Sequence, residues 1–219
     1  MSQTVTRLSV FFLGVFISCI AYCVTVRAGI GLGPLFLVQV AFERLVGVSA
    51  GVAATLIGLL LVVLSALLRG GVGPGTVLAP VLGGVIIDLA LPLIPSVQGT
   101  ALQIISCAVA TAVMMLGAAL ITHADFGVGG MDGVMRGLAN RLGVRHGSVR
   151  LAMEASLLLI GLSLGSRAGI GTVITALLVG HCYQFWMYLL SQPRQKCLVA
   201  EESPAQLSTP QQEELANAF

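Results

Sequence analysis

Six long apolar runs separate the few charged residues of this 219-residue chain. Most of these runs approach the roughly 20 residues that an α-helix needs to cross the hydrocarbon layer of a membrane. The composition agrees, because 57% of the residues are hydrophobic and only 9% are charged, against about 45–50% and about 25% in soluble domains. We therefore predict an all-α, polytopic membrane protein with six transmembrane helices. The runs cover residues 8–26, 51–68, 77–94, 101–122, 151–164 and 172–190.

The chain repeats itself at a constant shift of 96 residues. Fifteen residues between positions 28 and 84 are identical to their counterparts at this shift, and seven of the fifteen are glycine. This unbroken register indicates an internal duplication. The two halves, residues 8–96 and 101–191, each contain three predicted spans. Because three is an odd number, the second copy enters the membrane from the opposite side, which predicts the inverted repeat found in many secondary transporters.

Positive charges predict the orientation, because cytoplasmic loops collect Lys and Arg. With six spans, eight of these residues fall on one side of the membrane and three on the other. We expect a bacterial inner-membrane protein with both termini in the cytoplasm, a short N-terminal segment at 1–7 and a polar, disordered tail at 193–219. The cytoplasmic group is Arg7, Arg69, Arg136, Arg141, Arg145, Arg150, Arg194 and Lys196, and the outer group is Arg27, Arg44 and Arg167.

Each half also contains a short segment, residues 34–46 and 130–142, that is apolar on one side and too short to cross the membrane. Each segment follows a glycine turn, at Gly33 and at Gly129, and glycine permits a sharp reversal of the backbone. We predict that both are short helices, either re-entrant or lying flat at the membrane interface.

Ionisable side chains inside a span are costly to bury, by about 2.5–3.5 kcal/mol on insertion scales, so each calls for a partner or a function. Asp88 lies in the third predicted span and Glu154 in the fifth. We predict that both bind a proton or a cation, while an ion pair with Arg150, four residues earlier, is an equal alternative for Glu154. His181 and Gln184 share one side of the sixth span and are further candidates, although a lone histidine more often serves packing.

Glycine-threonine turns precede the last span of each half, in VGPGTV and AGIGTV. Thr76 and Thr172 are suited to cap a helix, and the flexible Gly75 and Gly171 lie directly before them. A helix that begins at membrane depth presents free N–H groups to an anionic group of a substrate, which makes both turns candidate binding sites. The alternative is a tight turn at the membrane surface with glycines for close helix packing.

Asp132 and Arg136 are four residues apart in the second short segment. An i,i+4 pair at a surface explains them, and a gating role is the alternative.

Several of these stretches resemble one family. GLGPLFLVQVAFERLVGVSAG, GGVIID and GIGTVITALLVGHCYQ are similar to the YczE/YyaS/YitT group of bacterial integral membrane proteins, closest to the YczE branch, over about residues 10–190. The resemblance implies that Gly31, Gly33 and Pro34 form the first turn, that Asp132 follows the second, and that Arg150 pairs with Glu154.

We expect a secondary transporter or permease for a small solute, with proton coupling if burial raises the pKa of a carboxylate. The alternative is a non-transporting accessory protein that docks a cytoplasmic partner through Arg136, Arg141 and Arg145. No grouping of residues indicates an enzyme, a metal site or a cofactor, and the dispersed arginines do not indicate nucleic-acid binding.

Overall fold

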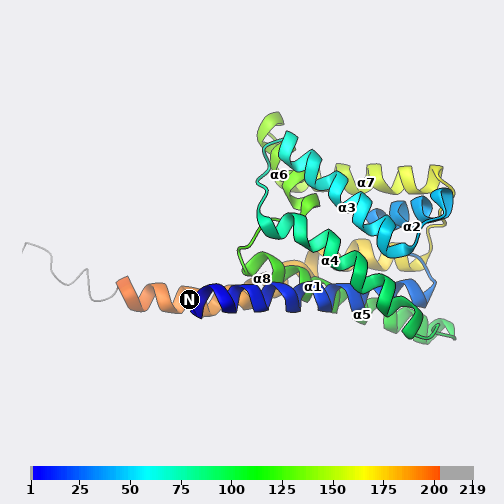
Figure 1. Cartoon of the computed structure of the whole chain (residues 1–219), viewed down its shortest axis with the longest axis horizontal. Coiled ribbons are helices and arrows are strands. Elements are labelled where there is room, and N and C mark those ends of the chain that lie inside the picture. Colours follow the sequence, from blue (N-terminus) through cyan, green and yellow to red (C-terminus); the bar gives the residue numbers. More distant parts are fainter. Residues whose placement is uncertain (1, 203–219) are drawn as a thin grey trace, which may run out of the picture.

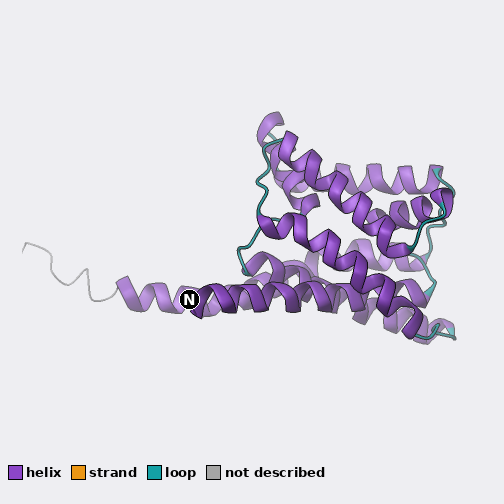
Figure 2. Cartoon of the chain, viewed as in Figure 1, coloured by secondary structure: helices purple, strands orange, loops and turns teal. Residues whose placement is uncertain are grey.

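The computed structural model describes residues 2–202, and their side chains for residues 5–190. Within these residues every regular element is a helix (Figure 2). The expected tail is helical in its first part, because the last helix continues to Glu202, and residues 203–219 lie outside the described residues. The elements are α1 (Ser2–Ala28), α2 (Pro34–Val46), α3 (Ala50–Leu67), α4 (Pro74–Ala90), the short 3-10 helix η1 (Leu91–Leu93), α5 (Thr100–His123), α6 (Gly130–Leu142), α7 (His146–Ser163) and α8 (Ile170–Glu202).

The helix boundaries recur at the shift of 96 residues. A shift of α2 by 96 gives the bounds of α6, and a shift of α3 gives those of α7. Local signals explain the agreement: α2 and α6 both end at a glycine in the left-handed region, Gly47 (φ 74°) and Gly143 (φ 64°), a conformation that glycine adopts without strain. The two short helices are therefore present where the sequence predicted them.

The helices form two layers (Figure 1). One layer contains α1, α5 and α8, the other contains α2, α3, α6 and α7, and α4 lies between them. In the second layer α2 packs against α7 and α3 packs against α6, so each short helix contacts a long helix of the other half.

The α1–α5 contact is the most extensive in the bundle and is made by small residues. A methyl group on Gly14 would lie 2.8 Å from the carbonyl oxygen of Gly117, so only glycine allows the two backbones to approach this closely. One turn further, the Ser18 hydroxyl donates to the carbonyl of Met114 at 3.4 Å. Residues 18 and 114 are counterparts at the shift of 96, so the halves meet along these two helices.

Five helices are long and apolar enough to cross a membrane, and the predicted sixth is not confirmed. The five are Val5–Ala28, Ala50–Leu67, Pro74–Leu93, Thr100–His123 and Ile170–Leu190. The missing one is α7, because His146, Arg150 and Glu154 make its first half polar.

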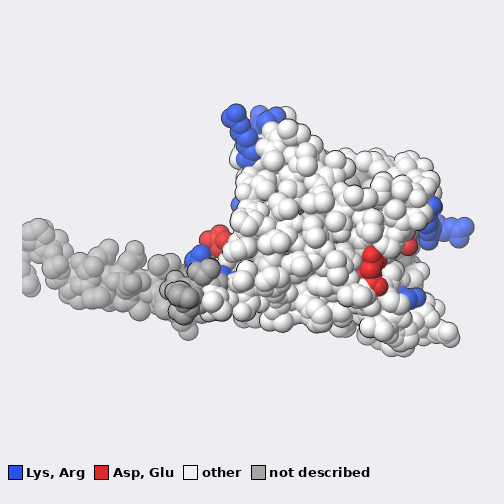
Figure 3. Space-filling model, viewed as in Figure 1, with Lys and Arg blue, Asp and Glu red and all other residues white. Residues whose placement is uncertain are grey.

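Charged side chains lie at the two ends of the bundle, and the visible surface between them is uncharged (Figure 3). This pattern is expected where the middle of a protein contacts hydrocarbon. Two arginines at the ends cap helices: Arg27 donates to the carbonyl of Leu91 at 3.1 and 2.6 Å, and Arg141 donates to the carbonyl of Leu67 at 2.7 Å. Such side chains satisfy carbonyl groups that a helix end leaves without partners.

The turn before α4 is joined to the other half of the chain. The Gly75 N–H donates to the carbonyl of Phe126, which lies in the loop between α5 and α6, at 2.9 Å. Within the turn, the Gly73 N–H donates to Oγ1 of Thr76 at 3.1 Å.

The turn before α8 makes the same bonds in the reciprocal direction. The Gly171 N–H donates to the carbonyl of Ile30 at 2.8 Å, and the Gly169 N–H donates to Oγ1 of Thr172 at 3.2 Å. Residues 30 and 126 are themselves counterparts at the shift of 96. These reciprocal contacts join residues 30–31 to 169–172 and residues 126–127 to 73–76. We call them the crossed turns.

Glycine is required on the acceptor side of the crossed turns. Gly31 has φ 118° and Gly127 has φ 151°, values that other residues rarely adopt. A methyl group on Gly31 would lie 2.7 Å from Oγ1 of Thr172, and one on Gly127 would lie 2.7 Å from Oγ1 of Thr76.

We therefore expect Gly31→Ala and Gly127→Ala each to lower the free energy of unfolding by about 2 kcal/mol or more, through backbone strain and steric overlap. Unfolding by sodium dodecyl sulfate in mixed micelles, followed by circular dichroism, measures the effect. Gly147→Ala is the matched control, because Gly147 is helical and a methyl group there would meet nothing within 4 Å. Equal stability of all three variants would contradict the role of the crossed turns.

Candidate functional site

Asp88 joins α4 to the beginning of α3. Its Oδ2 accepts a hydrogen bond from the Ser49 hydroxyl at 2.6 Å, and its Oδ1 accepts one from the Gly51 N–H at 2.8 Å. Ser49 is also the N-cap of α3 and accepts from the Val52 N–H. A carboxylate at this position bonds N–H groups that the helix leaves free and interacts favourably with the helix dipole. The partner of Asp88 is therefore the start of α3, and the predicted binding of a proton or a cation at Asp88 stays a prediction.

The second half has no equivalent of this link. The counterparts of Ser49 and Asp88 are Arg145 and Gln184, and the N-cap Arg145 makes no side-chain capping bond. While α3 and α4 pack extensively, α7 and α8 have at most marginal contact. The two halves thus share their secondary structure and differ in how their last two long helices pack.

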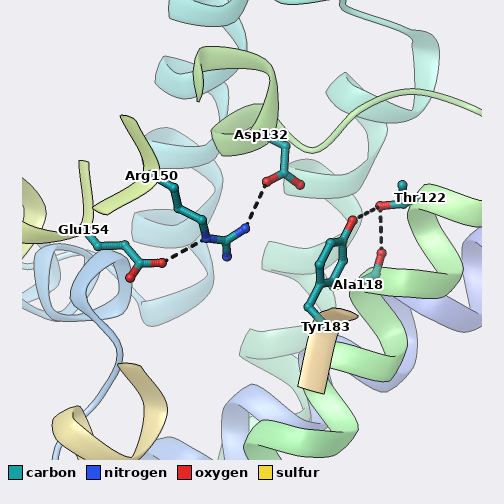
Figure 4. A network of polar contacts seen from close by, with 6 residues as sticks. All are labelled: Ala118, Thr122, Asp132, Arg150, Glu154 and Tyr183. Carbon is teal, nitrogen blue, oxygen red and sulfur yellow. Dashed lines mark hydrogen bonds and ion pairs between the residues drawn. The ribbon is translucent and has the colours of Figure 1, made fainter. Parts of the chain in front are cut away.

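Three charged side chains gather on the second half, and we call Asp132, Arg150 and Glu154 the charged cluster (Figure 4). Nε of Arg150 lies 3.2 Å from Oε1 of Glu154, and its Nη1 lies 3.7 Å from Oδ1 of Asp132. Asp132 comes from α6 and the other two from α7, so the cluster links the short helix to the polar part of the long one. The i,i+4 pair considered for Glu154 is present, and Arg150 also reaches the acid on α6.

The charged cluster is partly shielded from solvent. Between 23% and 31% of each side-chain surface is exposed. Burial raises the pKa of the Asp132 carboxyl, and the positive charges of Arg150 and Arg136 oppose this rise. Arg136 therefore acts on Asp132 electrostatically, although its own side chain is exposed.

Tyr183 of α8 lies near the charged cluster. Its hydroxyl is 3.0 Å from the Thr122 hydroxyl of α5, which itself donates to the carbonyl of Ala118 at 3.0 Å (Figure 4). Asp132 and Arg150 act electrostatically on this hydroxyl. Sequence reasoning did not select Tyr183 or Thr122, because a tyrosine and a threonine in apolar helices carry no distinctive pattern.

His181 and Gln184 lie on exposed parts of α8 and join no network with the acids among the described residues. Nδ1 of His181 lies 2.9 Å from the carbonyl of Leu177, one turn earlier on the same helix. The ring is therefore paired with its own helix, and its predicted role in binding stays a prediction.

The glycine-threonine turns use their N–H groups within the protein. In the crossed turns, Gly75 and Gly171 donate to carbonyls of the opposite half, and Thr76 and Thr172 accept from their own turns. Both threonines are almost fully buried, at 2% and 4% exposure. This geometry favours the packing alternative for these four residues over an anion site.

An open cavity of about 290 Å³ lies among α1, α2, α3, α4 and α5, and we call it the central cavity. Neither Asp88 nor the charged cluster lines it. Gln39 of α2 and Tyr22 of α1 contribute polar groups to its otherwise largely apolar wall. Sequence reasoning missed Gln39, and the available signal was an amide on the apolar side of a short helix. The wall consists of Ser18, Cys19, Tyr22, Phe36, Gln39, Ala54, Gly58, Ala79, Pro80, Gly83, Gly84, Ile87, Met114, Met115 and Ala118.

A second hollow, of about 250 Å³, lies beside the crossed turns. Arg44, Ser166 and Arg167 line it together with Gly31. The Ser166 hydroxyl donates to the carbonyl of Leu37 at 2.9 Å, so it is already paired. Among the described residues no group of three or more His, Cys, Asp or Glu is placed to hold a metal ion.

We expect Asp88→Asn to lower the free energy of unfolding by about 1.5–3 kcal/mol, because the bonds from Ser49 and Gly51 then lose a charged acceptor. Unfolding in mixed micelles, as for the glycine variants, measures the change. Asp125→Asn is the matched control, since Asp125 is exposed in a loop and asparagine tolerates its φ of 54°. If the two variants unfold alike, the link between α3 and α4 does not contribute to stability.

We expect Arg150→Gln to raise the pKa of Asp132 further, because the variant removes a positive charge that favours the carboxylate. At a given pH a larger fraction of Asp132 is then protonated. Infrared spectroscopy of the protonated carboxyl band, assigned by its loss in Asp132→Asn, follows this titration. Arg141→Gln serves as the control, because Arg141 bonds Leu67 instead. A titration that Arg150→Gln leaves unchanged would show that the two groups are not coupled.

Residues 5–188 match a family of unknown function, DUF6198. An uncharacterized membrane protein of Bacillus subtilis, YczE, is 26% identical over 185 residues, which cover 84% of this chain and 86% of that protein. An uncharacterized protein of Haemophilus influenzae is 31% identical over 90 residues, so the match spans 41% of the length of each chain. No solved structure matches the chain. The resemblance seen in the glycine-rich stretches is confirmed, and the chain belongs to this YczE-like family of membrane proteins, DUF6198.

Proposed function

We propose that this protein is a secondary transporter or permease that moves a small solute across the bacterial inner membrane. Its halves, residues 8–96 and 101–191, form an inverted repeat and alternate between two packing arrangements about the centre of the bundle. Both termini are cytoplasmic in this proposal, because eight of the eleven Lys and Arg residues lie on that side.

The direction of the helices supports the inverted repeat. In Figure 1, α1 runs away from the marked N-terminus and its counterpart α5 runs back toward it. The counterparts α3 and α7 also run in opposite directions, and so do α4 and α8. The reciprocal bonds of the crossed turns relate the halves in the same way.

We assign α7 as the sixth crossing. It has 18 residues, like α3, and a helix of that length spans about 27 Å at 1.5 Å per residue. Its polar residues, Arg150 and Glu154, pair with each other and with Asp132 of α6. Ionisable residues inside membranes are rare and typically mark pathways of ions or substrates.

The observation that carries the proposal is the difference between the two halves. The pair α3–α4 is closed by Asp88, whereas its counterpart α7–α8 is apart. In a transporter built of inverted repeats, the two halves can exchange their conformations, and this exchange opens the binding site to the opposite side of the membrane. The state with α7–α8 closed and α3–α4 apart is then the second end state of the cycle.

Proton binding at the charged cluster is the coupling step that we propose. Burial favours the neutral form of the Asp132 carboxyl, and Arg150 favours its charged form. A movement of α7 relative to α6 changes the distance between these groups and thereby the proton affinity of Asp132. The group takes up a proton when Arg150 withdraws and releases it when Arg150 returns.

The alternative, docking of a cytoplasmic partner through Arg136, Arg141 and Arg145, has less support. Arg141 is engaged at the end of α3, and Arg136 acts on Asp132.

Disulfide trapping tests the alternation directly. In a chain whose five native cysteines are replaced, R145C with Q184C places thiols at the counterparts of Ser49 and Asp88. We expect this pair to form a disulfide only when α7 and α8 close. Solid-supported membrane electrophysiology on proteoliposomes, screened with panels of amino acids, carboxylates, sugars and neutral aromatic compounds, then measures transport currents.

We expect at least one compound to produce currents that oxidation of the pair abolishes and a reductant restores. Currents in Asp125→Asn should match those of the wild type, while Asp132→Asn should change their pH dependence. A pair that never forms a disulfide, or the absence of current across the panels, would contradict the proposal.

A further inference from the structure

The central cavity carries no charge on its wall. None of its lining residues is an acid, a lysine or an arginine, and most of the surface comes from apolar side chains and glycines of α1, α3, α4 and α5. An ion placed there would lose part of its hydration without gaining a partner of opposite charge, which is unfavourable. The cavity therefore suits a neutral molecule.

Gln39 is the unusual residue of this wall. It is 7% exposed, and its side-chain amide forms no hydrogen bond with any part of the chain that the structure describes. Its amide atoms are not fully enclosed, so they remain accessible from the cavity, and a polar side chain this deeply placed without a protein partner is available to hydrogen-bond an occupant. Tyr22, 4% exposed, lines the same cavity, and within the described residues its hydroxyl has no hydrogen-bond partner either.

The volume of the cavity limits the size of its occupant. At about 290 Å³ it is roughly twice the size of an engineered apolar cavity of about 150 Å³ that binds benzene. A bicyclic aromatic compound, or an aliphatic body of similar volume, therefore fits. Gln39 offers a donor and an acceptor side by side, which matches a carboxamide or lactam group of the occupant.

We propose that the central cavity is a binding site for a neutral, mainly apolar solute with one amide-like group, which hydrogen-bonds to the side chain of Gln39. This inference rests on the proposed transport function for its biological meaning, and binding itself is measurable without transport. The charged cluster does not line this cavity. In this proposal the charged cluster binds the proton, and the cavity binds the solute.

Three naphthyl probes of nearly equal size test the site on the full chain in lipid nanodiscs. The probes are 2-naphthamide, 2-naphthoate and naphthalene, and their fluorescence is titrated against protein-free nanodiscs as the blank. We expect saturable binding of 2-naphthamide and at least about tenfold weaker binding of 2-naphthoate. Gln39→Leu should weaken 2-naphthamide binding about tenfold, as expected for the loss of one or two hydrogen bonds, and should leave naphthalene binding unchanged.

A cavity-filling variant gives the second arm. Ala54→Leu places a larger side chain in the cavity and should weaken both 2-naphthamide and naphthalene binding, whereas Ala155→Leu, on the exposed side of α7, should weaken neither. The proposal is overturned if 2-naphthoate binds as tightly as the amide, if Gln39→Leu affects amide and naphthalene equally, or if no probe saturates. Transport currents without probe binding would refute this binding site but not the proposed transport function. Saturable probe binding without currents would refute the transport function but not the binding site.

Discussion

Backbone polar groups that lack water as a partner must find partners within the protein, and this constraint shapes the centre of the molecule. Each half interrupts its helices at a glycine-rich turn, which leaves N–H groups in the first turn of the next helix, and C=O groups in the loops, without helical partners. The crossed turns satisfy them reciprocally, since Gly75 donates to Phe126 and Gly171 donates to Ile30. Neither half satisfies its own turn alone, so the two copies have to fold together.

The same duplicated plan supports two different packings. Asp88 holds α4 to the start of α3, while Gln184, its counterpart, makes no such bond and α8 lies apart from α7. The charged cluster belongs to the looser half, and the central cavity is lined mainly by the tighter one. In the transport cycle that we propose, this division separates a proton-binding region from a solute-sized space, and both act through alternation between the halves.

Much of the fold was predictable because it depends on local signals. The bounds of α2 and α6 follow from glycine turns, and the apolar runs predicted the five spanning helices. The fifth run, residues 151–164, is not confirmed as a span, because the polar start of α7 lowers the hydropathy of the whole helix. For the site, the pair of Arg150 with Glu154 followed from its i,i+4 spacing. Other features of the site depend on residues far apart in the chain. Asp132 approaches Arg150, Asp88 bonds the start of α3, and Gln39 faces a cavity. No spacing rule predicts such contacts.

Sequence alone determined the helical class, the duplication at 96 residues and the membership of the YczE-like family, because hydropathy and repeated glycines are properties of the chain itself. Tertiary structure alone decided which groups face each other. Thr76 and Thr172, which read as possible ligand sites, became parts of the crossed turns, and Gln39, which attracted no attention, became an unpaired amide on a cavity wall. The physical reason is that a polar group's role depends on whether another group satisfies it, and that partner comes from a different helix.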